Sequence, residues 1–173
     1  MRVPFNSTTP PTGAPSAAAW GTLAILVILY FLSILDRQLL SLLVVPIQTD
    51  LKLSDSQLGA AQGLAFILFY SVMGLILAYA VDRFSKAWIV FLGVGFWSLS
   101  TIACGLASNF GELFTARLGV GAGEAVLGPA AASLMGALFP RDRLSLANGI
   151  YMASVGAAGL TAFWLGGTLL VHL

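Results

Sequence analysis

Long apolar stretches separated by short polar connectors organise this sequence. Asp, Glu, Lys and Arg are absent from four stretches, residues 3–35, 56–81, 87–111 and 144–173. A further stretch, residues 113–140, is equally apolar apart from Arg117 and Glu124. Each is long enough to cross the hydrocarbon core of a bilayer, which takes about 20 residues of helix. We therefore predict an all-α membrane protein with five transmembrane helices, at residues 20–46, 57–81, 87–107, 109–139 and 146–171.

The segment before these helices differs in composition. Residues 1–19 have proline at positions 4, 10, 11 and 15, with Ser and Thr between them. Such a composition predicts a disordered lead-in. It is not typical of a signal peptide, because no short charged region directly precedes the apolar run. Residues 20–173 then form the transmembrane bundle, and Ser54 or Asp55 is expected to cap its second helix.

The basic residues in the connectors predict the orientation. A cytoplasmic N-terminus places five basic residues inside and only Lys52 outside; the five are Arg2, Arg83, Lys86, Arg141 and Arg143. This distribution satisfies the positive-inside rule. We expect a multi-pass protein of a bacterial plasma membrane, with the N-terminus in the cytoplasm.

Composition excludes several other classes of protein. Of the 173 residues, 58% are hydrophobic and 9% charged, and the mean hydropathy is +0.94. A soluble domain carries roughly 25% charged residues, so a soluble fold is excluded. The net charge of +1 provides no basic surface for nucleic acid. With only Cys104 and His172 available, neither a disulfide framework nor a Cys/His zinc site is possible, and we expect no metal or cofactor.

Four ionisable residues fall within the predicted spans: Asp36 and Arg37 in the first helix, and Arg117 and Glu124 in the fourth. Leaving all four unpaired in hydrocarbon would cost on the order of 10 kcal/mol. They must therefore face one another, water or a ligand. Such residues are candidates for function.

Depth matching predicts one ion pair. Asp36 lies ten residues before Pro46, and Arg117 lies eight residues after Asn109, at the same end of the bundle. At 1.5 Å per residue these positions are roughly 15 and 12 Å below that surface. We expect Asp36 and Arg117 to pair, either as a structural tie between helices or as part of a functional site.

The other two charges leave alternatives open. Glu124 lies seven residues after Arg117 and so projects from the same helix face. It has no obvious single partner, which favours a protonatable role. Arg37 is about 100° around the helix from Asp36. It is expected to contact either an anionic substrate or Glu124.

Small residues surround this face of the fourth helix. Gly119 and Gly123 form a small-xxx-small step, which favours close packing of a neighbouring helix. Pro129 is expected to bend the helix just beyond Glu124. Phe69, Tyr70 and Trp97 are interpreted as ordinary packing residues.

Several short motifs along the chain carry a family resemblance. Asp82, Arg83 and Lys86, between the second and third helices, and residues 117–123 (ArgLeuGlyValGlyAlaGly), in the fourth helix, resemble the loop signature and the fourth-helix motif of the major facilitator superfamily. Further segments are similar to the Spinster-like branch of that superfamily: LeuAspArgGln (35–38), LeuSerAspSerGlnLeuGly (53–59), TrpSerLeuSerThr (97–101), AlaArgLeuGlyValGlyAlaGlyGluAla (116–125) and LeuPhePro (138–140).

This resemblance implies a twelve-helix secondary transporter built from two six-helix halves, of which this chain would be an N-terminal fragment. It implies that Asp36 and Glu124 are proton-coupling residues and that Arg37 and Arg117 are their partners or substrate contacts. It also implies that Asp82, Arg83 and Lys86 form a cytoplasmic gate. The substrate would be an organic anion or an amphipathic, lipid-like solute, and the missing C-terminal half would be a partner.

Two other classes of function compete with a transporter. A non-transporting scaffold or assembly subunit is the alternative, and it predicts tolerance of neutral substitutions at all four charges. An intramembrane enzyme is not expected. Glu124 follows GlyAlaGly, but no second free carboxylate or Ser/His dyad accompanies it.

Overall fold

The computed structural model describes residues 13–172, and this part of the chain is helical apart from short connectors. Its elements, in chain order, are α1 (Ala17–Leu42), α2 (Val44–Leu51), α3 (Asp55–Gly59), the π-helical segment η1 (Ala60–Leu64), α4 (Ala65–Arg83), α5 (Lys86–Leu106), α6 (Phe110–Glu124), α7 (Leu127–Leu138) and α8 (Arg141–His172). Within this part, five helical stretches are long and apolar enough to span a membrane, as predicted: Ala17–Leu42, Asp55–Arg83, Lys86–Gly105, Phe110–Leu138 and Arg141–Thr168.

The first span starts earlier than predicted. Helix α1 begins at Ala17, because Ser16 accepts a hydrogen bond at 3.2 Å from the backbone N–H of Ala19. Such a side chain satisfies one of the free donors at a helix start. The prediction of disorder is therefore wrong for residues 17–19, and its residues 1–12 lie outside the described part of the chain.

The first span also ends differently, because Pro46 interrupts it instead of ending it. Proline lacks an N–H and its ring clashes with the carbonyl four residues earlier, which here belongs to Leu42. Accordingly α1 ends at Leu42, Leu43 leaves the helical conformation, and α2 resumes at Val44. Pro46 then lies in the first turn of α2, where proline is tolerated.

The second span runs from Asp55 to Arg83 and is two residues longer at each end than predicted. Of the two candidate caps, Ser54 is the one used. Its side chain accepts from the backbone N–H of Gln57, and the Gln57 side chain accepts from the backbone N–H of Ser54 at 3.0 Å. This reciprocal capping box satisfies two donors at once.

Proline also accounts for an interruption of the fourth span. Helix α6 ends at Glu124 and α7 begins at Leu127, with a turn at Ala125 and Val126. Pro129 lies four residues after Ala125 and cannot donate to its carbonyl. The predicted bend beyond Glu124 is therefore present.

The last span begins at Arg141, five residues before its predicted start. The carbonyl of Pro140 accepts from the backbone N–H groups of Arg143 and Leu144, both at 3.0 Å. Asp142 lies in the first turn, where the helix dipole favours a negative charge.

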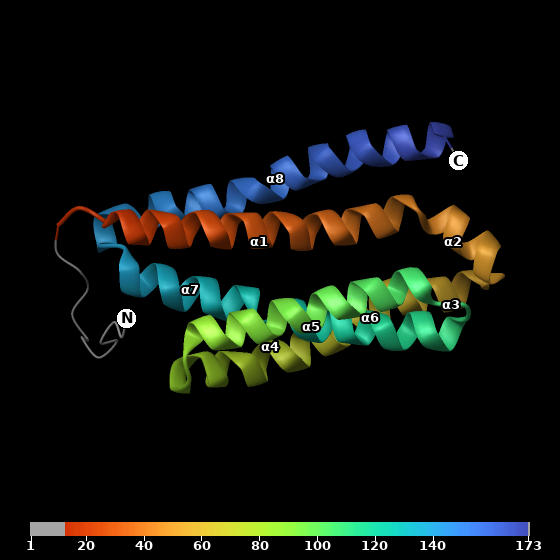
Figure 1. Cartoon of the computed structure of the whole chain (residues 1–173), viewed down its shortest axis with the longest axis horizontal. Coiled ribbons are helices and arrows are strands. Elements are labelled where there is room, and N and C mark those ends of the chain that lie inside the picture. The colour runs from red at the N-terminus through yellow and green to blue at the C-terminus, as the bar shows by residue number, and fades with distance from the viewer. Residues whose placement is uncertain (1–12, 173) are drawn as a thin grey trace.

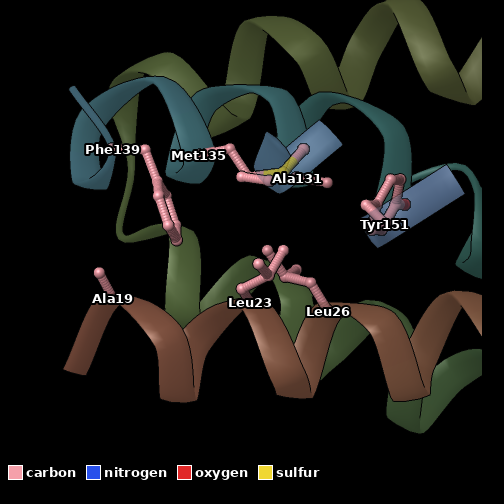
Figure 2. Close-up of a cluster of buried hydrophobic side chains, with 8 residues drawn as sticks. Ala19, Leu23, Leu26, Ala131, Met135, Phe139 and Tyr151 are labelled. Atoms are coloured by element: carbon pink, nitrogen blue, oxygen red, sulfur yellow. The ribbon is translucent and has the colours of Figure 1, made fainter. Parts of the chain in front are cut away.

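Two groups of helices make up the bundle (Figure 1). Helices α1 and α8 run side by side, whereas α6 packs on both α4 and α5. Helix α7 joins the groups because it contacts both α1 and α4. Figure 2 shows the cluster of buried side chains where α1, α7 and α8 meet: Ala19, Leu23, Leu26, Ala131, Met135, Phe139, Ala147 and Tyr151.

Many large apolar side chains face outward. Leu75, Leu160 and Trp164 are among the exposed ones, at 78%, 76% and 70%. Charged residues, in contrast, are enclosed between helices: Arg117 and Glu124 are buried. This distribution is the reverse of that in a soluble protein and matches a lipid environment.

Candidate functional site

The contact region of α1, α4 and α6 brings together all four charges predicted within the spans. Asp36 Oδ2 lies 3.7 Å from Arg117 Nη1, and Arg37 Nη2 lies 2.6 Å from Glu124 Oε2. Two ion pairs therefore link α1 to α6 at successive depths. The first is the pair predicted from depth matching, and the second is one of the two contacts expected for Arg37. The other expected contact, with an anionic substrate, stays a prediction.

Glu124 is fully buried and has defined partners, so the expectation that it lacks a single partner is wrong. Its Oε2 accepts from Ser33 Oγ at 2.6 Å and from Arg37 Nε at 2.8 Å. Arg37 Nη2 also lies 3.0 Å from Ser33 Oγ. By contrast, Oε1 is buried with no hydrogen-bond partner among the described residues. All of the hydrogen bonding to this carboxylate therefore converges on one oxygen.

Two aromatic rings of α4 complete the surroundings of the arginines. Arg37 Cζ lies 4.6 Å from the ring centroid of Phe66 and 5.1 Å from that of Tyr70. Arg117 Cζ lies 5.4 Å from the same Phe66 ring. These distances are those of cation–π contacts. Phe66 thus touches both guanidinium groups and connects the two ion pairs.

The placement of Phe66 depends on the backbone of two neighbouring segments. It is the second residue after η1, at whose end the N–H of Ala65 bonds to the carbonyl of Ala60, one residue further back than in an α-helix. On the other side, a Cβ at Gly121 would lie 2.7 Å from the Phe66 carbonyl oxygen. Only glycine allows α6 to approach α4 this closely.

Ser33 and Phe66 were not predicted as part of this site, and Tyr70 was expected to be an ordinary packing residue. One weak signal was available: Ser33 precedes Arg37 by four residues, and Phe66 precedes Tyr70 by four, so each pair shares a helix face. That spacing does not say which helix the face meets.

Gly119 and Gly123, the two α6 glycines predicted to allow helix packing, face α5. A Cβ at Gly123 would meet the backbone nitrogen of Trp97 and the carbonyl oxygen of Gly93, at 2.7 and 2.8 Å. A Cβ at Gly119 would meet the Ser100 side chain instead. Both glycines thus sit where the two helices are in close contact.

The predicted gate residues lie away from the four charges. Asp82 and Arg83 end α4, and Lys86 begins α5. Arg83 Cζ lies 4.5 Å from the ring centroid of Tyr79, and the Asp82 side chain is exposed. These residues form a separate polar connector at one end of the bundle.

A small cavity of about 130 Å³ adjoins the site on the side of α7 and α8. Tyr30, Tyr70, Tyr151 and Asn148 supply its polar lining, and methionines at 135 and 152 supply apolar surface. The rings of Tyr30 and Tyr151 stack with centroids 4.5 Å apart. The Tyr151 hydroxyl is buried and has no hydrogen-bond partner within residues 13–172.

No group of three or more His, Cys, Asp or Glu side chains that could hold a metal ion occurs in the described part of the chain. The charged groups here are already matched as two carboxylates with two guanidiniums. Chemically, the arrangement can store, exchange and release charge: protonating a carboxylate frees its arginine for another anion.

Comparisons with known proteins agree with this architecture. Residues 26–173 match the family model described as Major Facilitator Superfamily. The chain is 34% identical over 154 residues to an MFS-type efflux pump of Mycolicibacterium smegmatis, covering 89% of this chain and 36% of the relative. It is 29% identical over 126 residues to Protein spinster of Drosophila melanogaster, covering 73% of this chain and 21% of the relative.

One solved structure is similar over most of the chain. It is the crystal structure of a bacterial homologue of the human lysosomal transporter Spinster, in an inward-facing and unoccupied conformation. The TM-score is 0.84 with 36% sequence identity, covering 91% of this chain and 33% of that one. This chain therefore spans about a third or less of the length of these relatives.

Proposed function

This chain belongs to the major facilitator superfamily, a family of membrane transporters that includes its Spinster relatives, and from that premise we propose that it serves proton-coupled transport. It is a multi-pass integral membrane protein, and its proposed cargo is a small molecule. The proposed substrate is an organic anion or an amphipathic, lipid-like solute. The proposal rests chiefly on the two carboxylate–guanidinium pairs enclosed between α1 and α6.

The coupling role is assigned to Asp36 and Glu124. Protonation of either carboxylate removes the charge that its arginine pairs with, so the arginine is then available to an anionic group. Deprotonation restores the pair and expels the anion. Because Phe66 contacts both arginines, protonation that releases one arginine also changes the surroundings of the other.

The substrate role is assigned to Arg37 and its aromatic surroundings. Arg37 has 29% of its side chain exposed, whereas the Arg117 side chain has 4%. A guanidinium with free donors recognises carboxylate or phosphate groups. The adjoining tyrosine- and methionine-lined cavity suits an apolar or aromatic part of the same molecule.

We further propose an N-terminus in the cytoplasm of a bacterial cell, with the chain in the plasma membrane. Asp82, Arg83 and Lys86 then lie on the cytoplasmic side as the gate. Alternating access requires two bundles that move against each other, so a partner bundle is also part of the proposal.

The test is proton flux in proteoliposomes that hold this chain together with the complementary two thirds of the bacterial Spinster homologue. An alkylsulfonate, which stays ionised and carries no protons across lipid by itself, is added outside, and a trapped pH dye reports proton entry. Asp36→Asn and Glu124→Gln should each reduce flux by about tenfold or more, because an amide, unlike a carboxylate, has no ionisation near neutral pH and cannot carry the coupled proton. Asp142→Asn is the matched control, since Asp142 is a surface carboxylate with 76% exposure.

The outcomes separate coupling from the alternatives. Unchanged flux in both Asp36→Asn and Glu124→Gln would reject the coupling role. Anion uptake that persists without proton entry would indicate an uncoupled carrier. If no solute moves and all four charges tolerate neutral substitution, the chain is better described as a scaffold subunit.

A further inference from the structure

A cavity of about 350 Å³ lies between α1–α2 and α5–α6, on the side of the Asp36–Arg117 pair away from Glu124. Asp50 and Leu51 at the end of α2, together with Ala107 at the end of α5, line its outer part, and Asp36 and Arg117 lie at its inner part. It therefore runs from the α2 end of the bundle to the ion pair. It is separate from the tyrosine-lined cavity near α7 and α8.

Three polar atoms with no hydrogen-bond partner in the described chain belong to residues that line this cavity: Asp36 Oδ2, Thr101 Oγ1 and Arg117 Nε. Arg117 is only 3% exposed, and a buried polar atom left unsatisfied is costly. Water satisfies such groups where the space is polar and large enough. At about 30 Å³ for each water molecule, this cavity has room for roughly ten.

The other groove beside Asp36 shares Asp36 and Thr101 with this cavity, but it lacks Arg117 and Asp50. It lies between α1 and α5 and is lined mainly by apolar side chains such as Leu29, Leu32, Val94 and Ile102. Water has few partners on such a surface. Hydration of Asp36 is therefore favoured from the α2 side.

We propose that this cavity is a water-filled inlet through which protons reach Asp36 from the aqueous phase on the α2 side, which is the outer side in the orientation proposed above. A hydronium ion in the inlet gives its proton to the Asp36 carboxylate, so that an O–H bond forms, a water molecule remains and Arg117 loses its counter-charge. Asp50 at the mouth attracts cations. The role of the proton in transport rests on the proposed function. The existence of the water-filled inlet does not depend on that function.

Several charged or titratable groups surround Asp36. Arg117 of α6 faces it directly, Arg37 is its neighbour on α1, and Cys104 of α5 lines the same cavity. Asp50 of α2 lies at the mouth, and Glu124 is engaged by Arg37. The inlet therefore leads to the Asp36 carboxylate, which forms an ion pair with Arg117 at 3.7 Å.

Cys104 provides a direct test, because it is the only cysteine of the chain and lines the inlet. Charged methanethiosulfonate reagents react with a thiolate, which forms in water and not in lipid. The membrane-embedded chain is treated from the outer side and, in inverted vesicles, from the inner side. We expect modification of Cys104 from the outer side only, faster with the cationic reagent than with the anionic one.

Three variants sharpen the test. Ala103→Cys combined with Cys104→Ser is the lipid-facing control, since Ala103 is exposed and adjacent in depth, and it should not react. Gly105→Leu should slow the modification of Cys104 by about tenfold, because Gly105 lines the inlet and a Cβ there meets open space that an apolar side chain would fill. Asp50→Asn should remove the preference for the cationic reagent.

Reaction of Cys104 with only a neutral, membrane-permeant maleimide would overturn the proposal, because the cavity would then be filled by lipid. Reaction only from the inner side, or at the rate of the Ala103→Cys control, would overturn it as well. Thiol modification needs no transport. Outer-side labelling combined with unchanged proton flux in Asp36→Asn would thus retain the inlet and reject the coupling role.

Discussion

Arg37 binds Glu124 through a single carboxylate oxygen. Its Nε and Nη2 lie 2.8 and 2.6 Å from Oε2, and Ser33 Oγ donates to the same atom. A bidentate pair would have divided these donors between the two oxygens. The convergent geometry leaves Oε1 without a partner among the described residues. Replacing Glu124 by the uncharged Gln should therefore affect stability differently from removing the whole side chain.

Glu124→Ala should destabilise the folded chain in detergent by about 3 kcal/mol, the lower end of the range for removing one partner of a buried ion pair. Arg37 and Ser33 would both lose their acceptor. Glu124→Gln should cost clearly less, because its amide oxygen still accepts their hydrogen bonds. Thermal unfolding followed by size-exclusion fluorescence measures both, and equal losses would contradict the proposed geometry.

The Asp36–Arg117 pair should show coupling in a double-mutant cycle. Asp36→Asn leaves Arg117 buried without a counter-charge, and Arg117→Gln leaves Asp36 without one. The double variant should be more stable than the sum of the two losses predicts, with a coupling of about 1 to 3 kcal/mol. Additive losses in the same unfolding assay would mean that the two side chains do not interact.

Phe66 should stabilise the arginines beyond its contribution to packing. Phe66→Leu is expected to lose about 0.5 to 2 kcal/mol more when Arg37 is present than when Arg37 is replaced by Met, because only the cation interacts with the ring face. Phe139→Leu is the matched control, since Phe139 is 1% exposed and its ring contact is with Trp20. If the stability lost in Phe139→Leu depends on Arg37 as strongly as the stability lost in Phe66→Leu, there is no cation–π contribution from Phe66.

The glycines of α6 and α7 should differ in their tolerance of alanine. Gly123→Ala is expected to cost about 1 to 3 kcal/mol by overpacking, because its Cβ would meet the backbone of α5. Gly119→Ala should cost less, since the Ser100 side chain can move aside. Gly128→Ala, which meets nothing within 4 Å, should be neutral or stabilising, and the order of unfolding temperatures checks the ranking.

Much of the architecture follows from the order of residues. Charge-free stretches of this length predict membrane spans whatever the neighbouring helices are, because insertion into lipid depends on the hydrophobicity and length of the segment itself. Asp36 and Arg117 could be paired in the same way, since depth along a helix is a matter of counting residues. The interruption next to Glu124 was predictable because proline acts on its own helix.

Other features depend on how helices rotate and approach one another. The packing of α1 on α7 and α8 directs Arg37 to Glu124, and counting residues along the first helix could not show this. The π-turn at residues 60–64 sets the rotation of Phe66, and no local preference of AlaAlaGlnGlyLeu requires it.

The sequence alone therefore determined which segments enter the membrane and which four charges go with them, because those outcomes depend on hydrophobicity and length. Only the tertiary structure decided that Ser33, Phe66 and the two arginines form one connected site. The reason is that rotation about a helix axis changes no property of the helix itself and is set solely by the surfaces packed against it.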